Sequence, residues 1–187
     1  AESSGTRGRG GPTFAAVWFD ANGDGWPDLM TSCETGKNDY LINQGDGTFV
    51  EAELPDVYGG FSMGITAGDI NNDGWPDIYV ANDHAANFLW INSHDGTFRE
   101  EAFFRGGALS AGGRPQASMG IACGDIDGNG HIDLLLTHLE GENNALYMGV
   151  DETGFRESSH RAGLAMASLG CTGFGTQFFD LDNDGDL

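Results

Sequence analysis

Four short segments of the chain place acidic and amide side chains at alternating positions before a glycine. They begin at Asp20, Asp69, Asp125 and Asp180, and the first three follow the pattern D-x-[DN]-x-[DN]-G-x-x-D. Oxygens at positions 1, 3 and 5 converge on one point when the backbone curls, and the glycine permits the sharp turn. A backbone carbonyl at position 7 and a carboxylate at position 9 complete an all-oxygen shell. Such a shell favours a hard cation, Ca²⁺ over Zn²⁺ or Cu²⁺.

The pattern therefore predicts about one Ca²⁺ site in each complete segment. The first site has the side chains of Asp20, Asn22, Asp24 and Asp28 and the carbonyl of Trp26 as ligands. The second has Asp69, Asn71, Asp73 and Asp77 with Trp75, and the third has Asp125, Asp127, Asn129 and Asp133 with His131. The fourth segment supplies Asp180, Asp182 and Asp184 but stops before position 9, so we expect an incomplete site.

These segments differ from EF-hand loops. An EF-hand requires glutamate at position 12, where this chain has Thr31, Val80 and Leu136. Strand-like sequence follows each segment, and Pro27 and Pro76 stand inside the first two, which disfavours flanking helices. Because Asp, Asn and Gly also favour turns, a hairpin turn without metal is the alternative. Three complete copies in register favour the metal site.

The acidic segments belong to a longer repeat. Their first aspartates lie 49, 56 and 55 residues apart, and each complete copy is followed by G-D-G-T-F, H-D-G-T-F or the weaker D-E-T-G-F. The distance from the aspartate to that phenylalanine is 29, 29 and 30 residues, whereas the segments between units vary. This predicts stacked modules rather than independent domains. We expect a Gly/Ser/Arg-rich segment over residues 1–13 and repeat units over about 14–62, 63–118, 119–173 and 174–187.

Each complete unit contains four short strand patterns. In the second unit, β-branched and aromatic runs cover residues 65–68, 77–81, 87–92 and 97–102. Four antiparallel strands in about 50 residues match one β-propeller blade, and one such sheet cannot cover both its faces alone. The sequence thus predicts an all-β fold, a propeller fragment of about three four-stranded antiparallel blades plus the first strand of a fourth. About 4–8 blades close a ring, so we expect the rest of a longer chain.

Composition excludes several classes of protein. The 187 residues include 8 Lys+Arg and 29 Asp+Glu, a net charge of −21, which excludes binding to nucleic acid and docking on an anionic membrane. A hydrophobic content of 39% excludes an acidic disordered tail. The uncharged stretch 162–179 is broken by glycines and polar residues, so no membrane insertion is expected, and no signal peptide is visible. Cys33, Cys123 and Cys171 are interpreted as small buried hydrophobes, with one disulfide and a leftover thiol as the alternative.

The acidic loop followed by N-x-[GH]-D-G-T-F resembles the FG-GAP/VCBS repeat, the blade unit of integrin α-chain-like propellers. The W-P pair inside the first two loops resembles most closely bacterial secreted proteins of the cartilage-acidic-protein (ASPIC/UnbV-associated) type. The resemblance covers essentially all residues from 14 to 187. It implies a β-propeller with Ca²⁺ in its blade hairpins and an extracellular, cell-surface or periplasmic location. It also implies a role in adhesion or ligand binding.

Alternating strand direction places the acidic loops on one face of the propeller and the variable connections between units on the other. Recognition usually resides in variable loops on a rigid scaffold. We therefore expect a protein or glycan ligand on the face opposite the acidic loops, with Arg105 and Arg114 in the longest connection, residues 103–118, as candidate contacts. The alternative for this connection is a glycine-rich spacer.

A non-enzymatic, calcium-stabilised binding or adhesion module is the leading interpretation, and no catalytic residue is assigned. The alternatives are a propeller-based enzyme, such as a polysaccharide lyase, and a structural scaffold. The G-x-S-x-G match at residues 60–64 is interpreted as the entry turn of a blade, because S-M-G recurs at residues 118–120. The histidines at positions 84, 94, 131, 138 and 160 are expected at surfaces or turns. Trp26 and Trp75 are expected to pack over their hairpins, with sugar stacking as the alternative.

Overall fold

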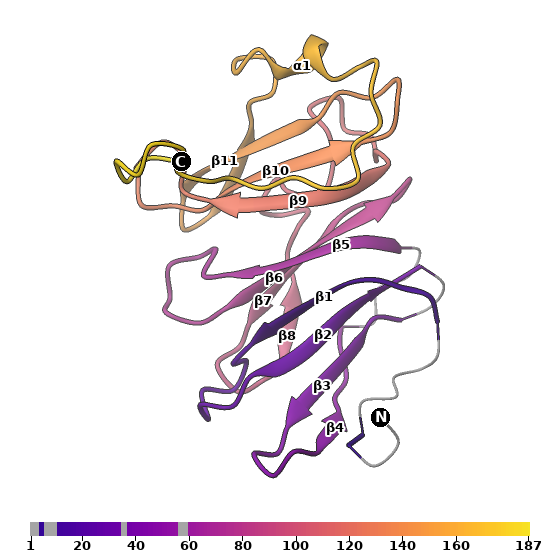
Figure 1. Ribbon diagram of the computed structural model, residues 1–187, viewed down its shortest axis with the longest axis vertical. Helices are drawn as coiled ribbons and strands as arrows, with labels where there is room; N and C mark the ends of the chain where they lie inside the picture. The colour runs from indigo at the N-terminus through magenta and orange to yellow at the C-terminus, as the bar shows by residue number, and fades with distance from the viewer. Residues whose placement is uncertain (1–3, 6–10, 35–36, 56–59) are drawn as a thin grey trace.

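The structure is a computed structural model, and it describes residues 4–5, 11–34, 37–55 and 60–187. Most of the predicted N-terminal segment, residues 1–3 and 6–10, therefore lies outside the described residues. Three four-stranded antiparallel sheets, here called blades 1 to 3, make up the fold (Figure 1). The all-β architecture of a propeller fragment is confirmed, since the described helical structure is confined to α1 (Leu164–Ala167).

The strands of each blade follow one another along the chain. Blade 1 contains β1 (Thr13–Phe19), β2 (Asp28–Cys33), β3 (Asp39–Asn43) and β4 (Phe49–Glu51). Blade 2 contains β5 (Phe61–Gly68), β6 (Asp77–Asp83), β7 (Phe88–Asn92) and β8 (Phe98–Glu100). Blade 3 contains β9 (Ser118–Gly124), β10 (Asp133–His138), β11 (Ala145–Asp151) and β12 (Gly154–Glu157). All neighbouring strands pair antiparallel.

The blades stack face to face, with the core between them. Between blades 1 and 2, Met30 and Tyr40 of one sheet lie in one buried cluster with Val80 and Trp90 of the other. Between blades 2 and 3, Tyr79 shares a second cluster with Leu134 and others. The first strands β1, β5 and β9 lie next to one another (Figure 1). Each blade thus buries a face that it could not cover by itself.

Glycines allow the first strands of neighbouring blades to approach closely. A Cβ atom added at Gly64 of β5 would lie 2.4 Å from the Met119 carbonyl oxygen of β9. A Cβ added at Gly120 of β9 would lie 2.8 Å from the Cα atom of Gly175. A side chain at Gly64 would therefore push β5 and β9 apart, and one at Gly120 would push β9 away from the backbone at Gly175.

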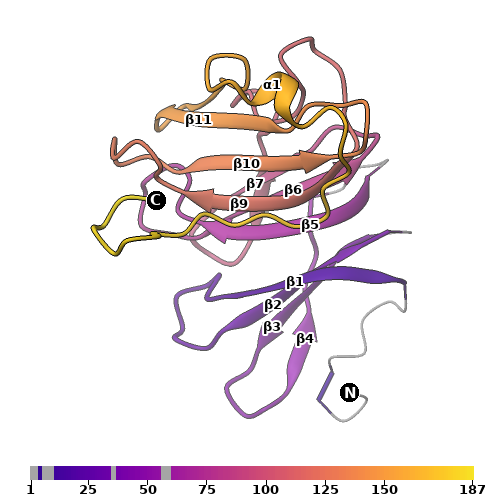
Figure 2. The same ribbon diagram turned by 45° about the horizontal axis from the view of Figure 1, so that its top comes forward.

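The predicted first strand of a fourth blade is not a regular strand. Residues 174–179 have no assigned secondary structure, although they run along β9 in both views (Figure 2). The reason is that a first strand in this fold pairs only with the second strand of its own blade. The residues after Asp180 form an acidic loop but supply no such second strand.

Two other expectations about the chain need correction. Ser62 lies within β5 and Ser118 begins β9, so the S-M-G segments are parts of strands rather than entry turns. Of the three cysteines, Cys33 is buried, whereas Cys123 is partly buried and Cys171 is exposed. No disulfide joins them. In the described part of the chain, no helix is long and apolar enough to cross a membrane.

Candidate functional site

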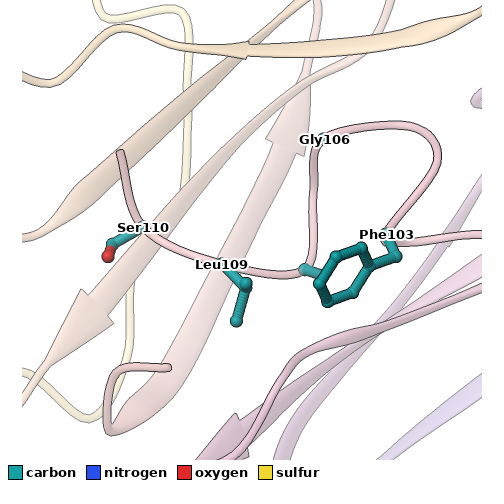
Figure 3. Close-up of a pocket in the computed structure, with 5 residues that line it drawn as sticks. Phe103, Gly106, Leu109 and Ser110 are labelled. Atoms are coloured by element: carbon teal, nitrogen blue, oxygen red, sulfur yellow. The ribbon is translucent and has the colours of Figure 1, made fainter. Parts of the chain in front are cut away.

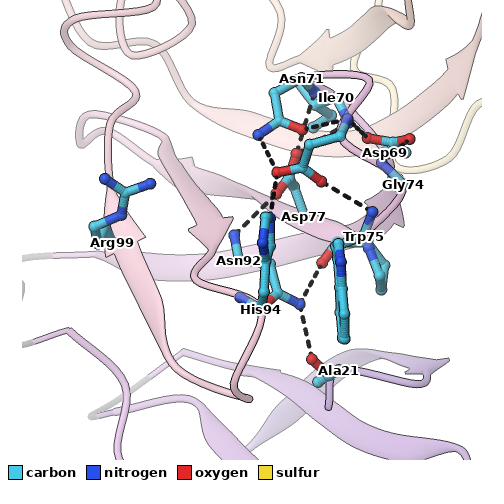
Figure 4. Close-up of polar contacts among 12 residues, drawn as sticks. Ala21, Asp69, Ile70, Asn71, Gly74, Trp75, Asp77, Asn92, His94 and Arg99 are labelled. Carbon is cyan, nitrogen blue, oxygen red and sulfur yellow. Dashed lines mark hydrogen bonds and ion pairs between the residues drawn. The ribbon is translucent and has the colours of Figure 1, made fainter. Parts of the chain in front are cut away.

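The first three acidic segments form the turns between the first and second strands of the blades, and all four segments lie along one side of the molecule (Figure 1, left). The first aspartate closes each turn with its own carboxylate. In blade 2, Asp69 Oδ1 accepts a hydrogen bond from the Asp73 amide at 2.9 Å, and Oδ2 accepts from the Gly74 amide at 2.9 Å (Figure 4). Gly74 adopts a left-handed φ of 88°, which explains the glycine at position 6.

The ninth-position aspartates are buried and join each loop to the third strand of its blade. Asp77 is 0% exposed; its Oδ2 accepts from the Ile70 amide at 3.0 Å and its Oδ1 from the Asn92 amide at 2.9 Å (Figure 4). Asp28 and Asp133 repeat this arrangement. The pKa of Asp77 is raised to about 6 because burial disfavours the charged form, and backbone hydrogen bonds oppose that rise only in part. Burial likewise raises the pKa of the other two.

Two loops bring three carboxylates together. In the third loop, oxygens of Asp125, Asp127 and Asp133 lie within 4.8 Å of one another, and Asp180, Asp182 and Asp184 do so in the fourth. No ion pair to a Lys or Arg involves these six side chains among the described residues. The close approach of like charges without a cationic side chain fits a site for a hard cation.

The first two loops have no such three-carboxylate group within the described residues. These loops have an amide at position 3 and a carboxylate at position 5, the reverse of the third loop. Asn22 Nδ2 donates to Asp24 Oδ2 at 2.9 Å, and Asn71 Nδ2 donates to Asp73 Oδ2 at 2.7 Å. The predicted ligands of these loops are thus neighbours. Each of the three complete loops holds three carboxylates and one amide, but only the third brings its three carboxylates within 4.8 Å of one another.

The second loop has a partner that its sequence pattern did not indicate. His94, in the turn between β7 and β8, lies with Nε2 2.8 Å from Asp73 Oδ2 (Figure 4). Its ring stacks on Trp75 at a centroid distance of 5.3 Å. Partial burial raises the pKa of Asp73, but hydrogen bonds from His94, Asn71 and the Trp75 amide outweigh it, so the pKa lies below its usual value. The sequence carries one signal of this partner, since His94 occupies the repeat position that is Gly45 in the first unit. Both residues adopt a left-handed φ in the structure.

Neighbouring loops contact one another. A Cβ atom at Gly23 would lie 2.7 Å from the Trp75 ring, so this indole packs on the first loop. Asn72 Nδ2 donates to the Gly130 carbonyl at 2.8 Å and lies 3.1 Å from His131 Nδ1 in the third loop. The packing interpretation of Trp75 is therefore supported by its contacts. Trp26 covers Gly45 in the same way but is 51% exposed.

The ends of the strands opposite the acidic loops carry buried polar pairs. Ser118 Oγ lies 3.1 Å from His138 Nε2, and His138 Nδ1 lies 2.8 Å from the Asn143 carbonyl. The expectation that every histidine is a surface or turn residue is wrong for His138, which is 1% exposed. Blade 2 has the equivalent pair Ser62 and Asn82, with Ser62 Oγ donating to Asn82 Oδ1 at 2.9 Å. Both serines are buried, and they tie the first strand to the second.

The connection between blades 2 and 3, residues 103–118, is anchored to both sheets. The Tyr79 hydroxyl donates to the Gly107 carbonyl at 2.5 Å, and the Tyr147 hydroxyl donates to the Leu109 carbonyl at 3.1 Å. Arg105 does not project as a ligand contact: its side chain is 15% exposed and donates to Glu101 Oε2 at 2.8 Å. Arg114 is exposed.

Comparison with known protein families gives one decisive match. The FG-GAP-like repeat model matches residues 20–80 and 69–136, so each matched stretch spans two successive acidic loops. The chain belongs to the FG-GAP-like repeat family. The match does not test the finer resemblance to the cartilage-acidic-protein type, which stays a prediction.

Other comparisons describe similarity alone. A comparison with curated proteins found none that matches this FG-GAP-like chain. One similar solved structure concerns specific recognition of non-reducing terminal N-acetylglucosamine by a lectin from Agrocybe aegerita, at 20% identity and a TM-score of 0.49. The likeness covers 74% of this chain and 36% of that one.

Proposed function

We propose that this FG-GAP-like chain is a calcium-stabilised β-propeller module that binds an extracellular ligand and is not an enzyme. The observation that carries the calcium part is the third loop. There, three carboxylates approach within 4.8 Å of one another, and one of them, Asp133, is fully buried. Burying a carboxylate beside two others is costly unless a cation or a proton neutralises it.

The predicted ligand set favours Ca²⁺ over softer metals. Carboxylate, amide and carbonyl oxygens are hard ligands, and Ca²⁺ accepts six to eight of them in flexible geometry. Asp125, Asp127, Asn129, Asp133 and the His131 carbonyl would hold the ion in the third loop. Bound Ca²⁺ would supply positive charge that links the start of the loop to the buried aspartate, and through it to the third strand of the blade.

We assign ligand binding to the face opposite the acidic loops. That face carries the variable connections, and the anchoring of residues 107–109 by two tyrosine hydroxyls supports a formed surface rather than a loose spacer. The family supports a location outside the cytoplasm, at the cell surface or in the periplasm. For catalysis we find no supporting geometry among the described residues, because the pairs that resemble a nucleophile and its base, such as Ser118 and His138, are buried.

The calcium proposal is tested by calorimetric titration of Asp127→Asn. The variant keeps the shape of the side chain and removes one charge from the third loop, so we expect the Ca²⁺ affinity of one site to fall about tenfold or more, about 1.4 kcal/mol. Glu152→Gln is the matched control, since it removes a charge from an exposed side chain outside the loops. Equal Ca²⁺ affinities for the two variants would refute the assignment of this site.

A further inference from the structure

A polar cavity of about 160 Å³ lies on the face opposite the acidic loops, beside blade 3. Three separate segments form it: the connection between blades 2 and 3, the turn between β10 and β11, and the end of β12 with the residues that follow. Its lining includes Ser110, Gln116, Asn143, Glu157 and His160. The acidic loops and their predicted cation sites contribute no residue to this lining.

Several polar atoms of the cavity are left available for a ligand. Glu157 accepts hydrogen bonds from Ser159 through Oε1 only, so Oε2 is uncommitted within the described structure. Gln116 donates through Nε2 to the Asn143 carbonyl at 3.3 Å, and its Oε1 carries no hydrogen bond there. Asn143 donates through Nδ2 to the Asn144 carbonyl at 2.9 Å. The cavity therefore presents oxygen acceptors together with the exposed ring of His160, a set suited to hydroxyl groups.

The walls of the cavity are fixed by contacts that do not involve a ligand. The Asn143 carbonyl also accepts from the buried His138 ring, and the Ala117 amide donates to Glu142 Oε2 at 2.7 Å. Gln116 forms an isolated β-bridge with Ala85 of blade 2. A preformed site of this kind loses little conformational entropy when it binds a ligand.

An apolar cavity of about 190 Å³ has Ser110 in its lining, as the polar cavity does. Figure 3 shows residues that line the apolar cavity. Phe103, Gly106, Ala108 and Leu109 complete its lining. In Figure 3 the side chains of Phe103 and Leu109 extend to the same side of the connection. Phe103 is 68% exposed, although a large aromatic side chain usually gains by burial. The two cavities thus offer an apolar surface as well as hydrogen-bonding groups.

Charge narrows the class of ligand. The polar cavity has Glu157 as its carboxylate and no Lys or Arg in its lining, and the whole chain has a net charge of −21. An anionic ligand would be repelled. A pyranose ring combines hydroxyl groups at its edge with an apolar C–H face, which matches both cavities without requiring charge.

We propose that these two cavities, here called the Ser110 site, bind one neutral pyranose unit of a glycan. This inference rests on the proposed function, because it specifies the ligand of the face opposite the acidic loops. Glu157, Gln116 and Asn143 accept hydrogen bonds from the sugar hydroxyls, and Phe103 covers its apolar face.

The test uses the chain of residues 1–187 in Ca²⁺ and a panel of neutral methyl pyranosides, with saturation-transfer NMR for detection and calorimetry for affinity. We expect at least one pyranoside to bind. Glu157→Gln retains an oxygen for Ser159 but removes the charged acceptor, and Gln116→Ala removes a second acceptor. Each is expected to weaken that binding about tenfold. His84→Asn is the control, an exposed histidine that lines neither cavity.

Three outcomes would overturn the assignment: no binding of any pyranoside, equal binding by Glu157→Gln and the control, or preferential binding of anionic sugars. Melting temperatures with and without Ca²⁺ separate this result from the calcium proposal. Glu157→Gln should retain the full calcium-dependent shift of the wild type. If Glu157→Gln loses sugar binding but keeps the calcium-dependent rise in melting temperature, the loss is specific to the Ser110 site.

Discussion

At the scale of single residues, the ninth-position aspartates have two distinct tasks. Each is a predicted cation ligand, and each also accepts backbone hydrogen bonds that hold its loop on the blade. Asp77 accepts from the amides of Ile70, Asn71 and Asn92. The aspartate therefore stabilises the fold through its oxygen atoms, independently of any metal.

Asp77→Asn is expected to destabilise the metal-free protein. In the wild type, both carboxylate oxygens of Asp77 accept from backbone amides. Asparagine has one oxygen, so its Nδ2 group would face a backbone N–H and leave at least one buried donor unpaired. We expect the free energy of unfolding in EDTA to fall by about 1–3 kcal/mol. Denaturant titration measures this, with Glu152→Gln as the charge-matched control. An unchanged unfolding midpoint would show that these hydrogen bonds contribute nothing.

His138 gives stability a pH dependence of predictable sign. Burial lowers its pKa in the folded state, and the Asn143 carbonyl and the charge of Glu142 offset that only in part. The unfolded chain therefore takes up the proton first, near the ordinary value of about 6.5. The contribution of His138 to stability is complete above that pH and is lost as the pH falls below it.

The comparison that isolates this effect is His138→Asn, which copies Asn82 of blade 2. The wild type should lose more unfolding free energy than the variant between about pH 7.5 and about pH 5. Other titrating groups, including the buried aspartates, are common to both proteins and cancel in the difference. Equal losses would contradict the buried, neutral state of His138.

At the scale of elements, the blades are held together by close approach of their first strands. Five residues before the first aspartate of the loop, unit 2 has Gly64 and unit 3 has Gly120, whereas unit 1 has Ala15. Two residues before that aspartate, units 2 and 3 have small residues, whereas unit 1 has Trp18. The sequence shows this difference plainly. Only the structure shows that Gly64 faces the backbone of blade 3 and that Gly120 faces the backbone at Gly175.

Gly64→Ala is expected to weaken the contact between blades 2 and 3. The added methyl group would lie 2.4 Å from the Met119 carbonyl oxygen, a backbone atom that cannot move alone. We expect a loss of about 1–3 kcal/mol of unfolding free energy at fixed Ca²⁺ concentration. Gly170→Ala is the matched control, since nothing lies within 4 Å of its added Cβ and its φ is not left-handed. Equal stability of the two variants would contradict close strand packing.

Much of this architecture could be predicted from periodicity and spacing. The turn residues and the apolar alternation of the second unit predict β6, β7 and β8 of blade 2 within two residues of their observed ends. β5 was predicted too short, since its glycine-rich start at Phe61 resembles a turn. The sequence of residues 174–179 alone does not determine whether they form a strand, because a strand requires hydrogen bonds to a neighbouring strand.

The sites were predictable to different degrees. The positions of the acidic residues follow from the loop pattern, but the pattern treats Asn and Asp at position 3 as equivalent. The structure separates them, since Asn71 binds Asp73 whereas Asp127 joins a group of three carboxylates. The pairing of His94 with Asp73 and the Ser110 site join residues far apart in sequence, and no single motif reveals such contacts.

At the scale of the whole molecule, acidity is concentrated in the repeated loops. Thirteen of the 29 acidic residues lie in the four acidic segments. They line one side of the stacked blades, where neighbouring loops contact each other through Trp75 and Asn72. Without cations, like charges there oppose the stacking that forms the core. Calcium should therefore stabilise the assembly of blades as well as each loop.

The most direct test of this account is the melting temperature of the chain in EDTA and in millimolar Ca²⁺, measured at equal ionic strength. A ligand that binds only the folded state adds about 2.7 kcal/mol per site at a concentration 100 times its dissociation constant. We predict a large, saturable rise in melting temperature with Ca²⁺ that Mg²⁺ at the same concentration does not reproduce. A melting temperature that is the same in EDTA and in Ca²⁺ would contradict the central claim that calcium stabilises this propeller module.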